Sequence, residues 1–93
     1  MAIYLVCYDI TDNRRRYQVA KLLSGYGLRV QKSVFECDLD DRHYPWVKQR
    51  MTRLINRAED QVRFYPLSAA ARKQVVIVGT KPEYAIDSKT FIV

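Results

Sequence analysis

Residues 2–16 read AIYLVCYDITDNRRR, an apolar run that ends in a carboxylate and is soon followed by three arginines. The run from Ala2 to Asp9 is rich in aromatic and branched residues, which predicts a strand buried on both faces and central in its sheet. Asp12 or Asn13 can then cap a helix that begins with the arginines. The sequence therefore places Asp9 at the end of a central strand, beside a cluster of positive charges.

Hydrophobic periodicity predicts the next two elements. Apolar residues at i, i+3, i+4 and i+7 predict a first helix, with Gly27 placed to end it. The residues of this stripe are Val19, Leu22, Leu23 and Tyr26. Residues 28–37 are predicted to form a second strand, with a bulge near Lys32 and Ser33 because the apolar phase changes there.

The second half of the chain follows an acidic loop. Pro45 suits the first turn of a second helix. The apolar stripe of that helix contains Tyr44, Val47, Met51, Leu54, Ile55 and Ala58. Residues 61–67 and 74–78 are predicted to be two further strands, and the chain ends in the apolar tip Phe91-Ile92-Val93.

We assign these elements to one ferredoxin-like α+β domain over residues 1–93, in the order βαββαβ with an extra C-terminal strand. Its core, residues 1–79, is predicted to hold a four-stranded antiparallel sheet with two helices on one face. So small a chain cannot leave the other face exposed, and we expect a homodimer formed through the sheet faces. The tip of the C-terminal segment, residues 80–93, is predicted to pair with a sheet edge of the other subunit.

The positive charge of the chain is concentrated in two blocks. The 93 residues carry a formal net charge of +6, and no acidic residue lies between Asp12 and Glu36 or between Asp41 and Glu59. Such an excess favours an acidic partner, most commonly nucleic acid. The predicted second helix carries Trp46 on the same flank as Arg50, Arg53 and Arg57. This flank is either a stacking and phosphate-binding surface or an ordinary charged solvent face.

The cysteine and histidine residues do not have the spacing of a metal-binding or redox site. Cys7 and Cys37 lie in apolar stretches without CxxC spacing, so both are predicted to be reduced packing residues. His43 is predicted to be a solvated loop residue. We see no signal peptide and no apolar run of membrane-spanning length, so we expect a cytoplasmic protein that does not engage a membrane.

Asp9 and Asp12 carry the chemistry of interest. A strand-end Asp can bind a divalent cation while nearby arginines bind a polyanion, and this combination suits phosphodiester cleavage. An Asp in this position can equally begin a turn. Asp12 suits a second metal ligand or the N-cap of the helix, and its spacing favours the cap.

Several stretches of the chain resemble the CRISPR-associated protein 2 family. They are Tyr8-Asp9-Ile10, the arginine-rich helix start, Gly27-Leu28-Arg29-Val30-Gln31-Lys32-Ser33-Val34-Phe35-Glu36 and Val62-Arg63-Phe64-Tyr65-Pro66-Leu67. The resemblance implies a member of the CRISPR adaptation module, which acquires new spacers for antiviral defence. It implies a metal-dependent endonuclease that cuts single-stranded RNA or duplex DNA.

The resemblance also implies the site residues. Asp9 is the implied catalytic residue and metal ligand, with one Mg²⁺ shared between the Asp9 carboxylates of two subunits. The implied nucleic-acid contacts are Arg14, Arg15, Arg16, Arg29 and Lys32. Tyr8, Ser33 and Phe35 are implied to support the site, with Tyr8 packing on the sheet face opposite Asp9.

Two other functions remain open at this point. The first is a non-catalytic, structural DNA-binding dimer that bridges the CRISPR integrase. The second is an unrelated ferredoxin-like RNA-binding or regulatory domain, against which the absence of an RNP-like aromatic motif and of a glycine-rich ligand loop both argue. The preference for RNA or DNA and the identity of the metal also stay open.

Overall fold

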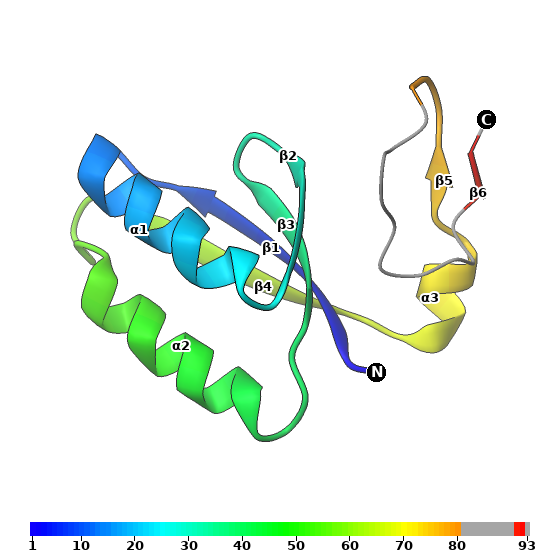
Figure 1. The fold of residues 1–93 in the computed structure, drawn as a ribbon, viewed down its shortest axis with the longest axis horizontal. Helices are drawn as coiled ribbons and strands as arrows, with labels where there is room; N and C mark the ends of the chain where they lie inside the picture. Colours follow the sequence, from blue (N-terminus) through cyan, green and yellow to red (C-terminus); the bar gives the residue numbers. More distant parts are fainter. Residues whose placement is uncertain (81–90, 93) are drawn as a thin grey trace.

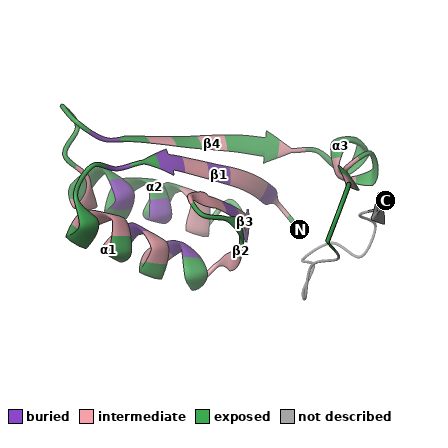
Figure 2. Ribbon diagram, turned by 90° about the horizontal axis from the view of Figure 1, so that it is seen from above, coloured by how far each residue is buried: buried purple, intermediate pink, exposed green. Residues whose placement is uncertain are grey.

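The computed structural model describes residues 1–80 and the backbone of residues 91 and 92 (Figure 1). Its elements are β1 (Ile3–Asp9), α1 (Asn13–Ser24), β2 (Gly27–Gln31), β3 (Val34–Asp38), α2 (His43–Leu54), β4 (Gln61–Leu67), α3 (Ala69–Lys73), β5 (Val76–Ile77) and β6 (Phe91–Ile92). The first four strands form an antiparallel sheet in the order β2-β3-β1-β4. Helices α1 and α2 cover one face of this sheet (Figure 2). The predicted ferredoxin-like α+β architecture, with the strand of Asp9 in the interior of the sheet, is therefore confirmed.

Residues 28–37 correct one detail of the predicted fold. They form two strands, β2 and β3, joined by a turn at Lys32 and Ser33, instead of one bulged strand. A register shift does occur, but it lies between Arg29 and Gln31 within β2. A tight turn and a bulge both reverse the apolar phase, so the phase change alone cannot distinguish them.

The fourth strand of the sheet is β4, and residues 74–78 do not join it. Only Val76 and Ile77 are extended there, and they pair in parallel with β6 in a separate two-stranded sheet. The short helix α3, which we did not predict, separates the two sheets. Ser68 caps it by accepting a hydrogen bond from the backbone N–H of Ala71 at 3.1 Å, and its alanines favour a helix.

Both long helices end earlier than predicted. Helix α1 stops at Ser24 with Gly25 as its C-cap, and Gly27 begins β2 instead of ending the helix. Gly27 is required for a different reason, because a β-carbon there would overlap the backbone carbonyl oxygen of Glu36 in β3. Helix α2 stops at Leu54, which leaves Ala58 in the following turn.

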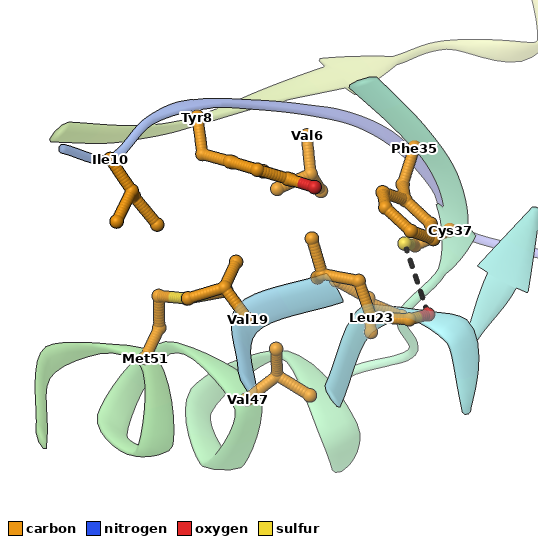
Figure 3. Packing of buried hydrophobic residues seen from close by; sticks show 10 residues of the cluster. Val6, Tyr8, Ile10, Val19, Leu23, Phe35, Cys37, Val47 and Met51 are labelled. Carbon is orange, nitrogen blue, oxygen red and sulfur yellow. Dashed lines mark hydrogen bonds between the residues drawn. The ribbon is translucent and has the colours of Figure 1, made fainter. Parts of the chain in front are cut away.

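The core lies between the sheet and the two helices (Figure 3). Val6 and Tyr8 of β1 point toward the helices and pack with Val19 and Val47, all of them buried. Cys37 is also buried, and desolvation raises the pKa of its thiol to about 12. Both cysteines are free, as predicted, although Cys7 is only half-buried.

The other face of the sheet has no covering element within the described residues (Figure 2). By strand alternation this open face carries Leu5, Cys7 and Asp9 of β1, which are half-buried or exposed, so β1 is covered on one face only and not on both as predicted. The predicted exchange of the Phe91-Ile92-Val93 tip stays a prediction: β6 pairs with β5 of its own chain, and residues 81–90 and Val93 lie outside the described residues. In the part of the chain that is described, no helix has the length and apolar character needed to cross a membrane.

Candidate metal and nucleic-acid site

Asp9 occupies the last position of β1, and its side chain is exposed. The residues on either side, Tyr8 and Ile10, are buried and anchor it from both directions. Within residues 1–80 no group donates a hydrogen bond to the Asp9 carboxylate. Asp9 thus presents an anionic oxygen pair that the fold of one subunit leaves available for a ligand.

The loop after Asp9 is held by Asp60, a buried residue that follows α2 in the sequence. Asp60 accepts hydrogen bonds from the backbone N–H of Thr11 at 3.2 Å and of Asn56 at 2.9 Å. Arg15 donates to the same carboxylate from Nε at 2.8 Å and also pairs with Glu59 at 3.1 Å. The hydrogen bond from Arg15, above all, lowers the pKa of Asp60 to about 2. This clasp ties the loop after β1 to the α2–β4 loop.

Arg16 holds the same loop from the other direction. Its guanidinium donates to the backbone carbonyl of Ile10 from Nε at 3.1 Å and to the carbonyl of Thr11 at 3.3 Å. It also donates to Asn13 Oδ1 at 2.6 Å. Two of the three consecutive arginines are therefore bonded to the chain itself, and Arg14 is the exposed one.

The turn between β2 and β3 lies beside the end of β1. The backbone N–H of Tyr8 donates to the carbonyl of Ser33 at 3.0 Å, and the Tyr8 hydroxyl approaches the carbonyl of Lys32 at 3.5 Å. The Tyr8 ring is buried against Phe35, with centroids 6.3 Å apart. Tyr8, Ser33 and Phe35 thus fix the turn that carries the exposed side chain of Lys32.

A hollow of about 390 Å³ lies between α1 and the β2–β3 hairpin and brings most of the predicted residues together. Its lining residues are Tyr8, Asn13, Arg16, Tyr17, Ala20, Arg29, Lys32 and Ser33. Arg29 also borders an adjoining hollow with Phe35, and its guanidinium carbon lies 5.2 Å from the centre of the Phe35 ring. Phe35 is 2% exposed, so it positions Arg29 more than it offers a surface of its own.

Asp9 does not line these hollows, because it lies on the open sheet face while they lie on the helix side. On its own face Asp9 is opposite Gln61 of β4. Arg63, two residues further along β4, donates to Gln61 Oε1 at 2.8 Å and to the Tyr65 hydroxyl at 3.1 Å. The hydrogen bond with Tyr65 raises the pKa of Arg63. The Asp9 carboxylate and the basic hollow thus lie at one end of the sheet, on opposite sides of it.

The structure shows Asp12 as a helix cap and corrects the predicted position of His43. Asp12 caps α1 by accepting a hydrogen bond from the backbone N–H of Arg15 at 2.9 Å, as its spacing indicated. His43 begins α2 instead of lying in a loop, and its Nδ1 is 3.0 Å from Asp40 Oδ1. The backbone N–H of His43 is the main reason that the pKa of Asp40 is lowered.

Sequence reasoning missed Asp60, Gln61 and Arg63. Asp60 looked like an ordinary loop carboxylate, and no local pattern shows that its partner is Arg15, 45 positions earlier. The alternation of β4 does place Arg63 and Tyr65 on one face, but only the pairing with β1 shows that Asp9 shares it. Register between distant strands is not a local property of the sequence.

The described residues can be compared with the ligands that a divalent metal ion requires. Mg²⁺ prefers an octahedral shell of oxygen ligands and is usually held by one or two carboxylates together with substrate phosphate. In the described part of the chain, no group of three or more His, Cys, Asp or Glu residues is placed to hold a metal ion. Asp9 can supply one carboxylate ligand to such a shell.

Fold and site together define a small ferredoxin-like domain with a free strand-end carboxylate and a basic hollow at one end of its sheet. The family described as "CRISPR associated protein Cas2" matches residues 1–75, and the chain belongs to this family. It is 44% identical to the "CRISPR-associated endoribonuclease Cas2 1" of Chloroflexus aurantiacus over 91 residues, which is 97% of this chain and 98% of that protein. The family that the motifs implied is thus confirmed.

Solved structures agree with the family. The crystal structure of Streptococcus pyogenes Cas2 at pH 6.5 has a TM-score of 0.73 and 37% identity, covering 78% of this chain and 94% of that one. A chain in a partial Cas6-RT-Cas1–Cas2 complex has a TM-score of 0.70 and 31% identity, covering 80% of this chain and 81% of that one. The fold described above is therefore that of the Cas2 family.

Proposed function

We propose that this chain is a metal-dependent endonuclease of the CRISPR adaptation module, working as a homodimer formed through the open sheet faces. The exposed, unbonded carboxylate of Asp9 at the end of the central strand carries the proposal. In a two-fold dimer the same surface of each subunit meets its counterpart, which allows the two Asp9 side chains to approach each other. The names of relatives as endoribonucleases support the activity.

Each residue has a separate task in this proposal. The two Asp9 carboxylates would hold one Mg²⁺, and the chemistry that this ion would supply is polarisation of a phosphoryl oxygen and a lowered pKa of bound water. Arg14, Arg29 and Lys32 are exposed cations near this end of the sheet and contact substrate phosphates without reading bases. Arg15 and Arg16 keep the loop after Asp9 in place through their bonds to Asp60 and Ile10.

A structural role is the second candidate. A relative with the same fold is part of a Cas1–Cas2 complex, and we propose that this chain likewise assembles with a Cas1 integrase. In such an assembly the dimer would hold DNA through its arginines without cutting it. This candidate is favoured by the lack, within one subunit's described residues, of a cluster of metal-ligating side chains around Asp9.

The substitution Asp9→Asn separates the two candidates. It removes an anionic oxygen ligand at nearly constant volume, so cleavage of single-stranded RNA and duplex DNA in Mg²⁺ should fall to the level seen with a chelator. Sedimentation should show an unchanged dimer. Asp41→Asn, the same change in an exposed loop residue before α2, is the matched control and should cleave normally.

Three outcomes decide between the candidates. Undiminished cleavage by the Asp9→Asn protein shows that the site lies elsewhere. Nucleic-acid binding without Mg²⁺-dependent cleavage in the unmodified protein supports the structural role. Cleavage that disappears with both the chelator and the Asp9 substitution supports the nuclease.

A further inference from the structure

We propose that the outer side of α2 is a second nucleic-acid surface, which binds the phosphate backbone of a duplex. We call this surface the α2 stripe and define it by Trp46, Arg50, Arg53 and Arg57. It lies on the helix side of the subunit, whereas Asp9 lies on the open sheet face (Figure 2). The α2 stripe contains none of the phosphate contacts proposed above, so it goes beyond the proposed function.

The helix geometry brings the α2 stripe together. Positions 46, 50 and 53 are spaced i, i+4 and i+7 and therefore share one side of the helix. Val47 and Met51, at other angles of the same helix, are buried against the core. Arg57 follows in the turn after the helix.

The charges of the α2 stripe are not neutralised by the protein. Arg50, Arg53 and Arg57 are exposed, and none of them forms an ion pair with any residue from 1 to 80. Helix α2 contains no acidic residue at all, although acidic residues at i+3 or i+4 are the usual partners of helix arginines. Like charges at this spacing destabilise a helix, so a polyanion laid along the stripe relieves a repulsion present in the free protein.

The surroundings of Trp46 favour a backbone contact over base stacking. Trp46 is 46% exposed, but the guanidinium carbon of Arg50 lies 5.5 Å from its ring centre. The Tyr26 ring packs beside it at a tilted 6.3 Å. Arg50 is thus preorganised on the indole face that a stacking base would need, and its remaining N–H groups are left to bind phosphate. We therefore assign a duplex backbone, not an unpaired base, as the occupant.

The α2 stripe also stays accessible in the proposed dimer. A dimer through the open faces covers β1 and β4 and leaves the helices outermost (Figure 2). The described acidic residues of the sheet strands, Asp9, Glu36 and Asp38, lie on the open face by strand alternation. Helices α1 and α2, in contrast, contain no acidic residue between their first and last positions, and the exposed carboxylates of the helix side lie in the loops around them.

Salt-dependent binding tests this surface directly. A labelled DNA duplex is titrated in chelator with Asp9→Asn protein, so that no cleavage contributes. Arg50→Gln and Arg53→Gln each remove one cation, and each should lower the slope of log affinity against log salt by about one, with about two for the double variant. Lys73→Gln removes one exposed cation from α3 as the matched control and should leave the slope unchanged.

Tryptophan fluorescence and thermal melting accompany the salt titrations. Trp46 is the single tryptophan, so its emission should change when duplex binds and should respond less in the Arg50→Gln protein. Unchanged thermal melting of the variants shows that the fold is intact. A salt slope that is the same in the double variant and the unmodified protein overturns the proposal. A contrary result is that the unmodified protein binds single-stranded DNA more tightly than duplex and that the Trp46→Leu variant loses this preference. That pair of results overturns binding to the duplex backbone and indicates base stacking.

Discussion

At the residue scale, Asp60 shows how one buried carboxylate organises a site that it does not touch. Its oxygens accept hydrogen bonds from the loop after β1, from the loop after α2 and from Arg15. Because these donors belong to segments far apart in the sequence, their positions depend on a charged Asp60. Asp9 is two residues from Thr11, so we expect the orientation of the Asp9 side chain to depend on the hydrogen bonds that Asp60 accepts.

The pH dependence of stability should report the ionisation of Asp60. Its pKa in the folded protein, about 2, lies below the ordinary value, about 3.9. The stability that the charged carboxylate provides is therefore complete above about pH 4 and is lost as the pH falls toward 2. Asp60→Asn should lower the free energy of unfolding at neutral pH and weaken this acid dependence, as measured by urea unfolding at several pH values. Asp41→Asn is the control, and an Asp60→Asn protein with the original acid dependence would refute the assignment.

At the element scale, the β2–β3 hairpin depends on close backbone contact at Gly27. Gly27 lies opposite Cys37 in β3, and a side chain there would meet the backbone at Glu36 and Cys37. The hairpin carries Arg29 and Lys32 to the hollow beside α1. Its position thus connects backbone packing with the placement of two proposed phosphate contacts.

Gly27→Ala should destabilise the domain, while Gly25→Ala should not. The new methyl at position 27 meets rigid backbone, and we expect a loss toward the upper end of the roughly 1–3 kcal/mol typical of overpacking. Gly25 has a helical backbone with φ of −74°, so alanine there is tolerated or slightly stabilising. Urea unfolding of both variants measures the difference. Equal stabilities would show that β2 can shift away from β3 without loss.

At the scale of the whole molecule, one subunit leaves two of its surfaces incomplete. The open face has no cover among the described residues, and β2 and β4 are unpaired edges of the four-stranded sheet. Val76 and Val78, near the end of the described chain, are 54% and 80% exposed. Exposed apolar side chains and free strand edges each favour association with a second copy.

Truncation after Asp87 should weaken the homodimer. It removes the Phe91-Ile92-Val93 tip, which we predict to pair with an edge of the other subunit, and each large apolar side chain buried there contributes about 1.5–3 kcal/mol. Sedimentation at low micromolar concentration measures the change, and circular dichroism checks that the four-stranded domain stays folded. A truncated dimer as tight as the full-length one would show that the tip pairs only within its own chain.

Elements whose evidence is local could be predicted from the sequence. The unbroken apolar run of β1, the stripe of Val47 and Met51 in α2 and the cap at Asp12 all follow from spacing within a few residues, and the structure confirms each. The motifs that resemble the family could be recognised in the same way, because each is a continuous stretch of sequence. Three features are visible only in the folded protein: the hairpin of residues 28–37, the hydrogen bond from Arg15 to Asp60, and the sheet face that Asp9 shares with Gln61. Each of these depends on pairing between segments distant in the chain, and such pairing is chosen by the packing of the whole domain rather than by the residues at either end.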